Sequence, residues 1–167
     1  MGKLVRALSE DGSVLCSAID TTDIVREIER LHQPTPVVTA ALGRMCTAGA
    51  IMGALLKNEG DTLTLRINGG GPCGTLTVVK DMGLKEPYVG QIPLVSGNIA
   101  EDITAYYTVS EQIPTVCALG IVFNEDATIK AAGGYMLQLV PPVLDSSVKV
   151  IEDNLQPVSY THLRAHE

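Results

Sequence analysis

Hydrophobic residues follow two different periods along this chain, and each period predicts its own kind of element. Apolar runs at 4–8 and 14–19 flank Glu10-Asp11-Gly12, which favours a β-hairpin. Apolar and polar residues alternate over 62–67, as is typical of a half-buried strand. Pro93 cannot donate to a strand ladder, so the strand around it is expected at a sheet edge. The other predicted strands are 75–79, 88–95, 115–123, 128–132 and 135–140.

Apolar residues three or four positions apart predict four helices. The first has Thr21 or Thr22 as its N-cap and ends before Pro34, and Asn98 caps the third, with Glu101 at the reciprocal capping position. The residues expected to face inward are Ile24, Ile28 and Leu31 in the first helix, Ile99, Ile103, Tyr106 and Tyr107 in the third, and Leu144, Val148, Ile151 and Leu155 in the last.

The second predicted helix, 36–56, is rich in Ala and Gly and apolar enough to resemble a membrane span. Arg44 lies near its centre, where a charge costs about 2.5–3.5 kcal/mol on insertion scales. We therefore predict a buried helix, with Gly49 and Gly53 allowing close backbone approach, and no membrane partner. Arg44 is expected to pair with a buried carboxylate or to reach the surface, and an anionic ligand is the alternative.

Hairpins with helices between them indicate an α+β domain with a mostly antiparallel sheet packed against helices, one of them the buried Ala/Gly-rich helix. The domain is expected to span 1–156. Residues 157–167 lose the apolar periodicity and hold two of the three histidines, so we expect a disordered tail that is not native to the domain.

Composition excludes several classes of protein. With 167 residues, 46% hydrophobic and 19% charged, the chain suits one folded domain, and disorder is excluded for most of it. A formal charge of -7 disfavours nucleic acid as a partner, and the absence of Trp disfavours base stacking. The N-terminus lacks the apolar segment of a secretory signal, which predicts a cytoplasmic protein.

Candidate chemistry is sparse, and the residues predict no catalytic, cofactor or metal site. Four widely spaced cysteines, Cys16, Cys46, Cys73 and Cys117, lack zinc or redox spacing and are expected to be small buried thiols. His32 is expected at the C-terminal end of a helix, with no orienting carboxylate. The acid pairs Glu101-Asp102 and Glu125-Asp126 are expected to be solvated.

The segment Gly69-Gly70-Gly71-Pro72-Cys73-Gly74 matches the spacing of a dinucleotide-binding fingerprint. That fingerprint needs a helix after its last glycine, with the helix N-terminus facing the pyrophosphate. Here strand residues follow, and Pro72 removes an amide donor. The prediction is a glycine-rich turn between two strands, and a nucleotide or small-molecule site remains the alternative.

Several phrases together resemble the N-terminal domain of the redox-regulated 33 kDa chaperonin family. The resemblance runs in family order from Leu4 to Leu155 and rests on Arg6-Ala7-Leu8, Thr21-Thr22-Asp23-Ile24-Val25, Ala40-Ala41-Leu42-Gly43-Arg44, Asn68-Gly69-Gly70-Gly71-Pro72, Val79-Lys80-Asp81-Met82-Gly83-Leu84, Tyr88-Val89-Gly90, Val95-Ser96-Gly97, Tyr107-Thr108-Val109-Ser110-Glu111-Gln112-Ile113-Pro114 and Ala131-Ala132-Gly133-Gly134-Tyr135. It implies a cytoplasmic, ATP-independent holdase that binds unfolded client proteins under oxidative stress, is active as a homodimer, and is switched by a zinc module of four cysteines.

The sequence departs from that family in three places. None of its four cysteines matches the zinc-switch cysteines, so no metal site is carried over. The family has several dozen residues between the Gly-Gly-Gly-Pro turn and the next strand, which predicts an internal deletion near 73–74. The tail 157–167 fits nothing in the family. We therefore expect a truncated and internally shortened member.

Two hypotheses follow for function besides the small-molecule or nucleotide site. The first is a non-enzymatic chaperone domain whose apolar surface binds clients without the zinc switch. The second is a fragment with no independent function.

Overall fold

The fold is known from a computed structural model that describes residues 2–70, 74–141 and 148–155. Its elements, in chain order, are β1 (Lys3–Leu8), β2 (Val14–Asp20), α1 (Thr22–His32), α2 (Pro36–Ala54), β3 (Thr62–Asn68), β4 (Thr75–Asp81), β5 (Tyr88–Pro93), α3 (Ile99–Tyr106), the π-helical turn η1 (Tyr107–Glu111), β6 (Thr115–Phe123) and β7 (Ile129–Leu139). Residues 148–155 form a last helix. The predicted α+β class is confirmed. The whole tail 157–167, Cys73 at the predicted deletion point and Leu144 lie outside the described residues.

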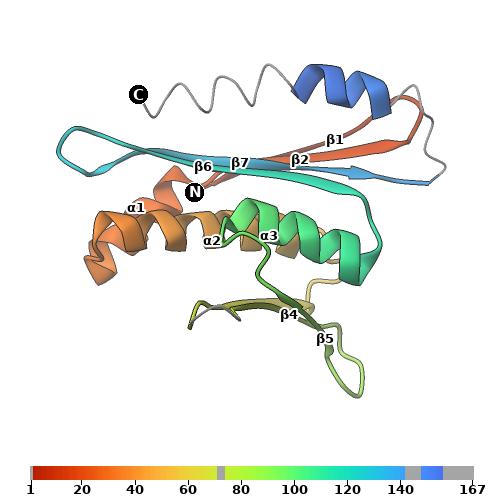
Figure 1. Cartoon of the computed structure of the whole chain (residues 1–167), viewed down its shortest axis with the longest axis horizontal. Coiled ribbons are helices and arrows are strands. Elements are labelled where there is room, and N and C mark those ends of the chain that lie inside the picture. The colour runs from red at the N-terminus through yellow and green to blue at the C-terminus, as the bar shows by residue number, and fades with distance from the viewer. Residues whose placement is uncertain (1, 71–73, 142–147, 156–167) are drawn as a thin grey trace.

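The strands form two antiparallel sheets with helices between them. The larger sheet has the order β1-β2-β7-β6 and the smaller one β3-β4-β5. Helices α1, α2 and α3 lie below the larger sheet in Figure 1, and β4 and β5 lie beneath the helices. The main core fills these layers with Ile51 and Met52 of α2, Leu76 and Val78 of β4, and Tyr106 of α3.

Strands from the two ends of the chain meet in the larger sheet. β1 and β2 form the predicted hairpin, and β2 pairs with β7 in a register that sets Val14 opposite Leu139. The two strands expected at 128–132 and 135–140 are a single strand, β7. Gly133 and Gly134 lie inside it because a Cβ there would come within 2.6 Å of the Ile19 carbonyl oxygen and 2.5 Å of the Ala118 carbonyl oxygen.

The N-cap of α1 is Thr21, as predicted, but no threonine side chain caps the helix, and of the predicted inward stripe only Ile28 is half-buried. The Asp20 carboxylate, not a threonine hydroxyl, accepts from the Thr22 amide at 2.9 Å. The side chain of Thr21 instead enters the core, where its hydroxyl bonds that of Thr47 at 2.6 Å. Val25, one turn later, shares this face and is fully buried, whereas Ile24 and Leu31 are exposed.

Helix α2 is buried along one face rather than all round. Its buried residues include Thr47, Ala48 and Ile51, while Val37 at its start is exposed. The closest approach occurs at Gly43, where a Cβ would clash with Ile121 Cδ1. At Gly49 a Cβ would make an ordinary contact with Leu65 Cδ1 at 3.6 Å, and at Gly53 it would have nothing within 4 Å. Among the described residues α2 is the one helix long and apolar enough to cross a membrane, and a soluble protein's core helix passes the same test.

The Thr21–Thr47 hydrogen bond predicts a measurable stability effect. Thr47→Val keeps the shape but leaves the buried Thr21 hydroxyl without its partner, so the free energy of unfolding is expected to fall by about 1–3 kcal/mol in urea denaturation. Thr104→Val is the control, since the Thr104 hydroxyl bonds only the Ala100 carbonyl of its own helix. An equal loss in both variants would contradict the assigned role.

The third helix follows its prediction closely. The Asn98 side chain accepts from the Ala100 amide at 3.1 Å, and Ile103, Tyr106 and Tyr107 are buried. The reciprocal bond differs, because Glu101 accepts from the Asn98 side-chain amide at 3.4 Å and not from its backbone. Val148, Ile151 and Leu155 of the last helix line a cavity against the larger sheet, as their spacing predicts.

Candidate functional site

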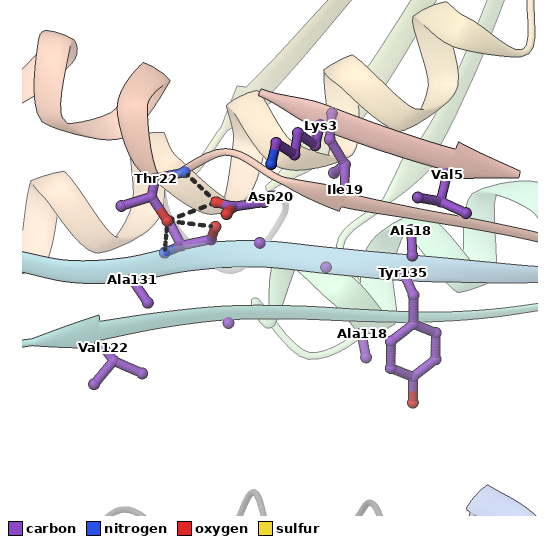
Figure 2. A pocket seen from close by; sticks show the side chains of 14 residues that line it. Lys3, Val5, Ala18, Ile19, Asp20, Thr22, Ala118, Val122, Ala131 and Tyr135 are labelled. Atoms are coloured by element: carbon purple, nitrogen blue, oxygen red, sulfur yellow. Dashed lines mark hydrogen bonds between the residues drawn. The ribbon is translucent and has the colours of Figure 1, made fainter. Parts of the chain in front are cut away.

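The larger sheet has one face on the helices and one apolar face turned away from them. On β6, Cys117, Leu119 and Ile121 are buried toward the helices, so the alternate residues of that strand point outward. The strand registers align Val5, Ala18, Tyr135 and Ala118 in one outward row. Figure 2 shows these four side chains lying one beside the other across the four strands. We call this surface the outer face.

A shallow hollow of about 610 Å³ lies in the outer face. Its floor consists of the small residues Ala18, Ala118, Gly120, Ala131 and Gly133. Its rim includes Val5 and Val122, which are 65% and 47% exposed, and the ring of Tyr135. Small residues on the floor and exposed valines at the rim make a non-polar surface that can accept side chains of another molecule.

Three polar residues, Lys3, Asp20 and Thr22, lie at one end of this hollow, and two of them, Asp20 and Thr22, bond each other. The Thr22 hydroxyl donates to Asp20 Oδ1 at 2.6 Å and accepts from the Ala132 amide at 3.0 Å. Hydrogen bonds from the Thr22 side chain and then its amide lower the pKa of Asp20. This network, drawn in Figure 2, joins β2, α1 and β7, so its polar atoms hold the fold together. Within the described lining we find no paired nucleophile and base.

The C-terminal helix covers another part of the same face. Figure 1 shows helix 148–155 above the larger sheet, on the side away from α1, α2 and α3. Between it and the sheet is a cavity of about 190 Å³ lined by Val116, Leu137, Leu139, Val148, Ile151 and Leu155, among others. Helix 148–155 therefore covers one end of the outer face, and no other described residue covers the other end, which we call the open part of the outer face.

A second hollow lies between α2 and β3 and holds about 1060 Å³. We call it the β3 hollow. Leu63, Leu65 and Ile67 of β3 line it opposite Leu42 and Met45 of α2. The loop from Leu94 to Ile99 and Asp102 contribute to its lining as well.

Asp102, expected to be solvated, is only 1% exposed. Its Oδ1 accepts from the Val95 amide at 2.7 Å and the Ser96 amide at 3.3 Å, while Oδ2 has no hydrogen-bond partner among the described residues. The loop before α3 folds back over the first turn of the helix and buries this carboxylate. Sequence reasoning missed Asp102 because an acid in a first helical turn is normally solvated, whereas Glu125 and Asp126 are exposed as predicted.

The described cysteines lie apart from one another in separate elements. Cys117 is buried, and Cys16 and Cys46 are half-buried. Burial raises the pKa of Cys117 to about 12 and also raises the pKa of the other two thiols. Such thiols form little reactive thiolate at neutral pH. Cys73 lies outside the described residues.

The other singled-out residues show no shared site. His32 is exposed in the last turn of α1, where it was expected. Arg44 is half-buried in a shallow hollow beside Phe123, and neither an ion pair nor a hydrogen bond links it to a described residue, so the expected carboxylate partner is not found.

The glycine-rich segment lies between two antiparallel strands, as predicted. Asn68 at the end of β3 pairs with Thr75 at the start of β4, and residues 71–73 lie outside the described part. Because β4 begins at Thr75, a strand and not a helix follows Gly74. The geometry required by a dinucleotide fingerprint is therefore not met.

The described residues do not fit a zinc site. Such a site needs three or four thiolate or imidazole ligands close together. In the described ranges no group of three or more His, Cys, Asp or Glu side chains converges in a way that could hold a metal ion.

Comparisons with known proteins agree on one group. The sequence model of the Hsp33 protein family matches residues 2–78 and 72–165. The 33 kDa chaperonin of Clostridium perfringens (strain SM101 / Type A) is 41% identical over 181 residues, which cover 83% of this chain and 57% of that protein. The 33 kDa chaperonin of Clostridium botulinum (strain Hall) is 39% identical over 197 residues, covering 93% of this chain and 67% of that one.

A solved structure is also similar. The crystal structure of a 33 kDa chaperonin (heat shock protein 33 homolog) from Thermotoga maritima matches with a TM-score of 0.83 and 30% identity, covering 90% of this chain and 66% of that one. The chain thus spans little more than half the length of the Clostridium perfringens protein. Since 83% of 167 residues is about 139, roughly 42 of the 181 aligned positions have no counterpart in this chain.

Proposed function

Because the chain belongs to the Hsp33 protein family, we propose that it is a molecular chaperone that binds unfolded proteins and holds them without ATP. The observation that carries this proposal is the open part of the outer face. There, Val5 and Val122 are exposed around a floor of small residues, and the neighbouring Asp20 and Thr22 bond each other. Burial of apolar surface needs no nucleotide and tolerates many client sequences, as a holdase requires.

The proposal is tested with a thermally unfolding reporter enzyme, in the absence of ATP, zinc and oxidant. The protein is expected to suppress light scattering by the unfolding enzyme. In Val5→Glu/Val122→Glu, two charges enter the rim of the outer-face hollow, and suppression is expected to fall by about half or more, because burying a carboxylate against a client is costly.

Leu84→Glu is the matched control. Leu84 is as exposed as Val5, at 65%, but lies in the loop that connects β4 and β5 of the smaller sheet. Its suppression should stay close to that of the unsubstituted protein. No suppression by the unsubstituted protein at severalfold molar excess would contradict the chaperone proposal, and equal loss in the double variant and the control would contradict the role of the outer face.

We further propose that the described domain binds clients without a redox switch of its own. Its three described cysteines have raised pKa values and are not close together, which supports a response to clients that peroxide leaves unchanged. We therefore propose that the redox control and the zinc site that the family resemblance implies lie in other parts of longer family members. A cytoplasmic location and a homodimer are proposed on the family resemblance alone.

The proposed domain covers 1–156, with a block of the family's sheet absent near 73–74. The two segments that match the family model overlap at 72–78, which supports an internal deletion there. The roughly 42 positions of the Clostridium perfringens alignment that have no counterpart in this chain support the same deletion. A cooperative thermal transition is expected, since the described core is continuous across α2, α3 and both sheets. A gradual, non-cooperative loss of structure would favour a fragment with no independent function.

A further inference from the structure

We propose that the free edge of β3 binds an extended segment of an unfolded protein as an additional antiparallel strand, with alternate side chains in the β3 hollow. This inference rests on the proposed function and names a second client site with a defined mode of binding. The site is distinct from the outer face, which belongs to the other sheet.

The direction of the backbone groups of β3 follows from one proline and one hydrogen bond. The Leu94 amide donates to the Gly74 carbonyl at 2.8 Å, and the neighbouring Pro93, opposite Thr75, has no amide hydrogen to donate. Successive residues of an antiparallel strand direct their N–H and C=O to opposite sides. Even-numbered residues of β4 therefore bond β5, and odd-numbered residues bond β3.

The same alternation fixes the groups at the free edge. Thr64 and Arg66 stand opposite Val79 and Thr77 and so bond β4. The N–H and C=O groups that point away from the sheet belong to Leu63, Leu65 and Ile67. Within the described residues nothing donates to or accepts from these groups. An edge of this kind is a template for an incoming strand.

The side chains of the same three residues define what the incoming strand must carry. They are half-buried and line the β3 hollow opposite Leu42 and Met45 of α2. A strand paired with all seven residues of β3 is about 23 Å long and sets every second side chain on this face. The hollow, at about 1060 Å³, is large enough for several side chains. The occupant therefore has apolar residues at alternate positions.

Asp102 adds a preference at one end of the hollow. Asp102 lines the same hollow as Gly69, which follows Asn68 at the end of β3, and among the described residues its Oδ2 has no hydrogen-bond partner. An antiparallel strand has its N-terminal end opposite Gly69. A lysine or arginine there, on the face of the apolar residues, would carry a positive charge into the hollow toward this carboxylate.

A second copy of this chain is a poorer occupant. Antiparallel pairing of two β3 strands would bring Asp61, just before β3, to the end that holds Asp102. Like charges in such proximity disfavour the pair. Client segments with a basic residue at this end are favoured instead, and the formal charge of -7 favours them as well.

The test uses a fluorescent peptide with the sequence Lys-Thr-Val-Thr-Val-Thr-Val, whose lysine and valines lie on one face. In the proposed register the valine amides donate to β3 and the threonine amides point away. N-methylation of the three valines is expected to weaken binding about tenfold or more in fluorescence anisotropy, because each blocked donor leaves an acceptor on β3 unpaired. N-methylation of the three threonines should change it little. Equal weakening by the two modifications would overturn the inference.

Two proline variants locate the site on the protein. Leu65→Pro removes an outward amide at the β3 edge, and Gln91→Pro removes one at the free edge of β5, so neither touches a bond to β4. Peptide affinity is expected to fall about tenfold in the first variant only. Equal effects would overturn the assignment to β3. If Leu65→Pro fails to fold, the methylated peptides still test the proposal on the unsubstituted protein.

The outcomes separate this inference from the proposed function. Suppression of aggregation together with equal binding of the two methylated peptides would reject the β3 site and leave the chaperone proposal standing. Absence of both suppression and peptide binding would reject both. One outcome would assign the β3 edge to a second copy of this chain: Leu65→Pro dissociates a dimer, and the peptide fails to displace either copy from the dimer of the unsubstituted protein. That outcome would overturn the inference.

Discussion

Glu111→Leu is expected to lower the free energy of unfolding by about 2–4 kcal/mol. Glu111 ends η1, and its Oε1 accepts from Lys80 Nζ of β4 and from the Tyr106 hydroxyl of α3, each at 2.5 Å. The side chains of Lys80 and Glu111 are only 16% and 18% exposed. Removing the carboxylate leaves the poorly solvated Lys80 ammonium without its ion-pair partner and takes one hydrogen-bond partner from the Tyr106 hydroxyl, and this loss outweighs the gain from a leucine side chain.

Equilibrium urea unfolding measures the effect, and two further variants assign it. Glu27→Ala deletes the same kind of group from an exposed pair with Arg30, where the loss should be much smaller because solvent screens the pair. In the background of Lys80→Met, Glu111→Leu should cost clearly less, because the stranded ammonium is gone. Equal costs of Glu111→Leu in both backgrounds would show that the ion pair is not the cause.

Gly134→Ala is expected to destabilise the protein by about 2–3 kcal/mol. A Cβ at this position would lie 2.5 Å from the Ala118 carbonyl oxygen and 2.8 Å from Leu119 Cδ2. The first contact is with backbone, so the β6–β7 pair must separate or shift to accommodate the methyl group. Because β7 also pairs with β2, the strain reaches the centre of the larger sheet.

Gly53→Ala is the opposite case and serves as the control. Gly53 lies in the last turns of α2, and a Cβ there has no neighbour within 4 Å. Alanine in a helix is favoured over glycine, so this variant should gain about 0.5–1 kcal/mol. Thermal and urea denaturation of the two variants should therefore give shifts of opposite sign. A neutral Gly134→Ala would contradict the close approach of β6 and β7.

Local elements were predictable because short-range signals mark them. Alternation over 62–67 locates β3, Pro36 and Asn98 mark the starts of α2 and α3, and Pro93 correctly predicts an edge strand. The partition into two sheets was not predictable, since the pairing of β2 with β7 joins residues more than a hundred positions apart. The stripe of α1 was misplaced because helix periodicity alone does not show that Thr21 points into the core.

The binding surfaces were less accessible to sequence reasoning than the elements. Strand β6 is apolar at nearly every position, so both of its faces are apolar. Its sequence therefore does not show which face the helices cover. Likewise, the sequence does not show which backbone N–H and C=O groups of β3 point away from β4. That depends on which residues of β4 bond β5, and the Leu94–Gly74 hydrogen bond shows this. The burial of Asp102 depends on the path of the loop before it, for which the sequence holds no regular pattern.

The pairing of β2 with β7 also affects synthesis of the protein on the ribosome. The N-terminal hairpin leaves the ribosome early, yet the strand that completes its sheet ends at Leu139. At about 5–20 residues per second, some 120 further residues take roughly 6–24 s to translate. During that interval the newborn hairpin has an open flank, and a protein of this fold must itself escape aggregation before its native contacts can close.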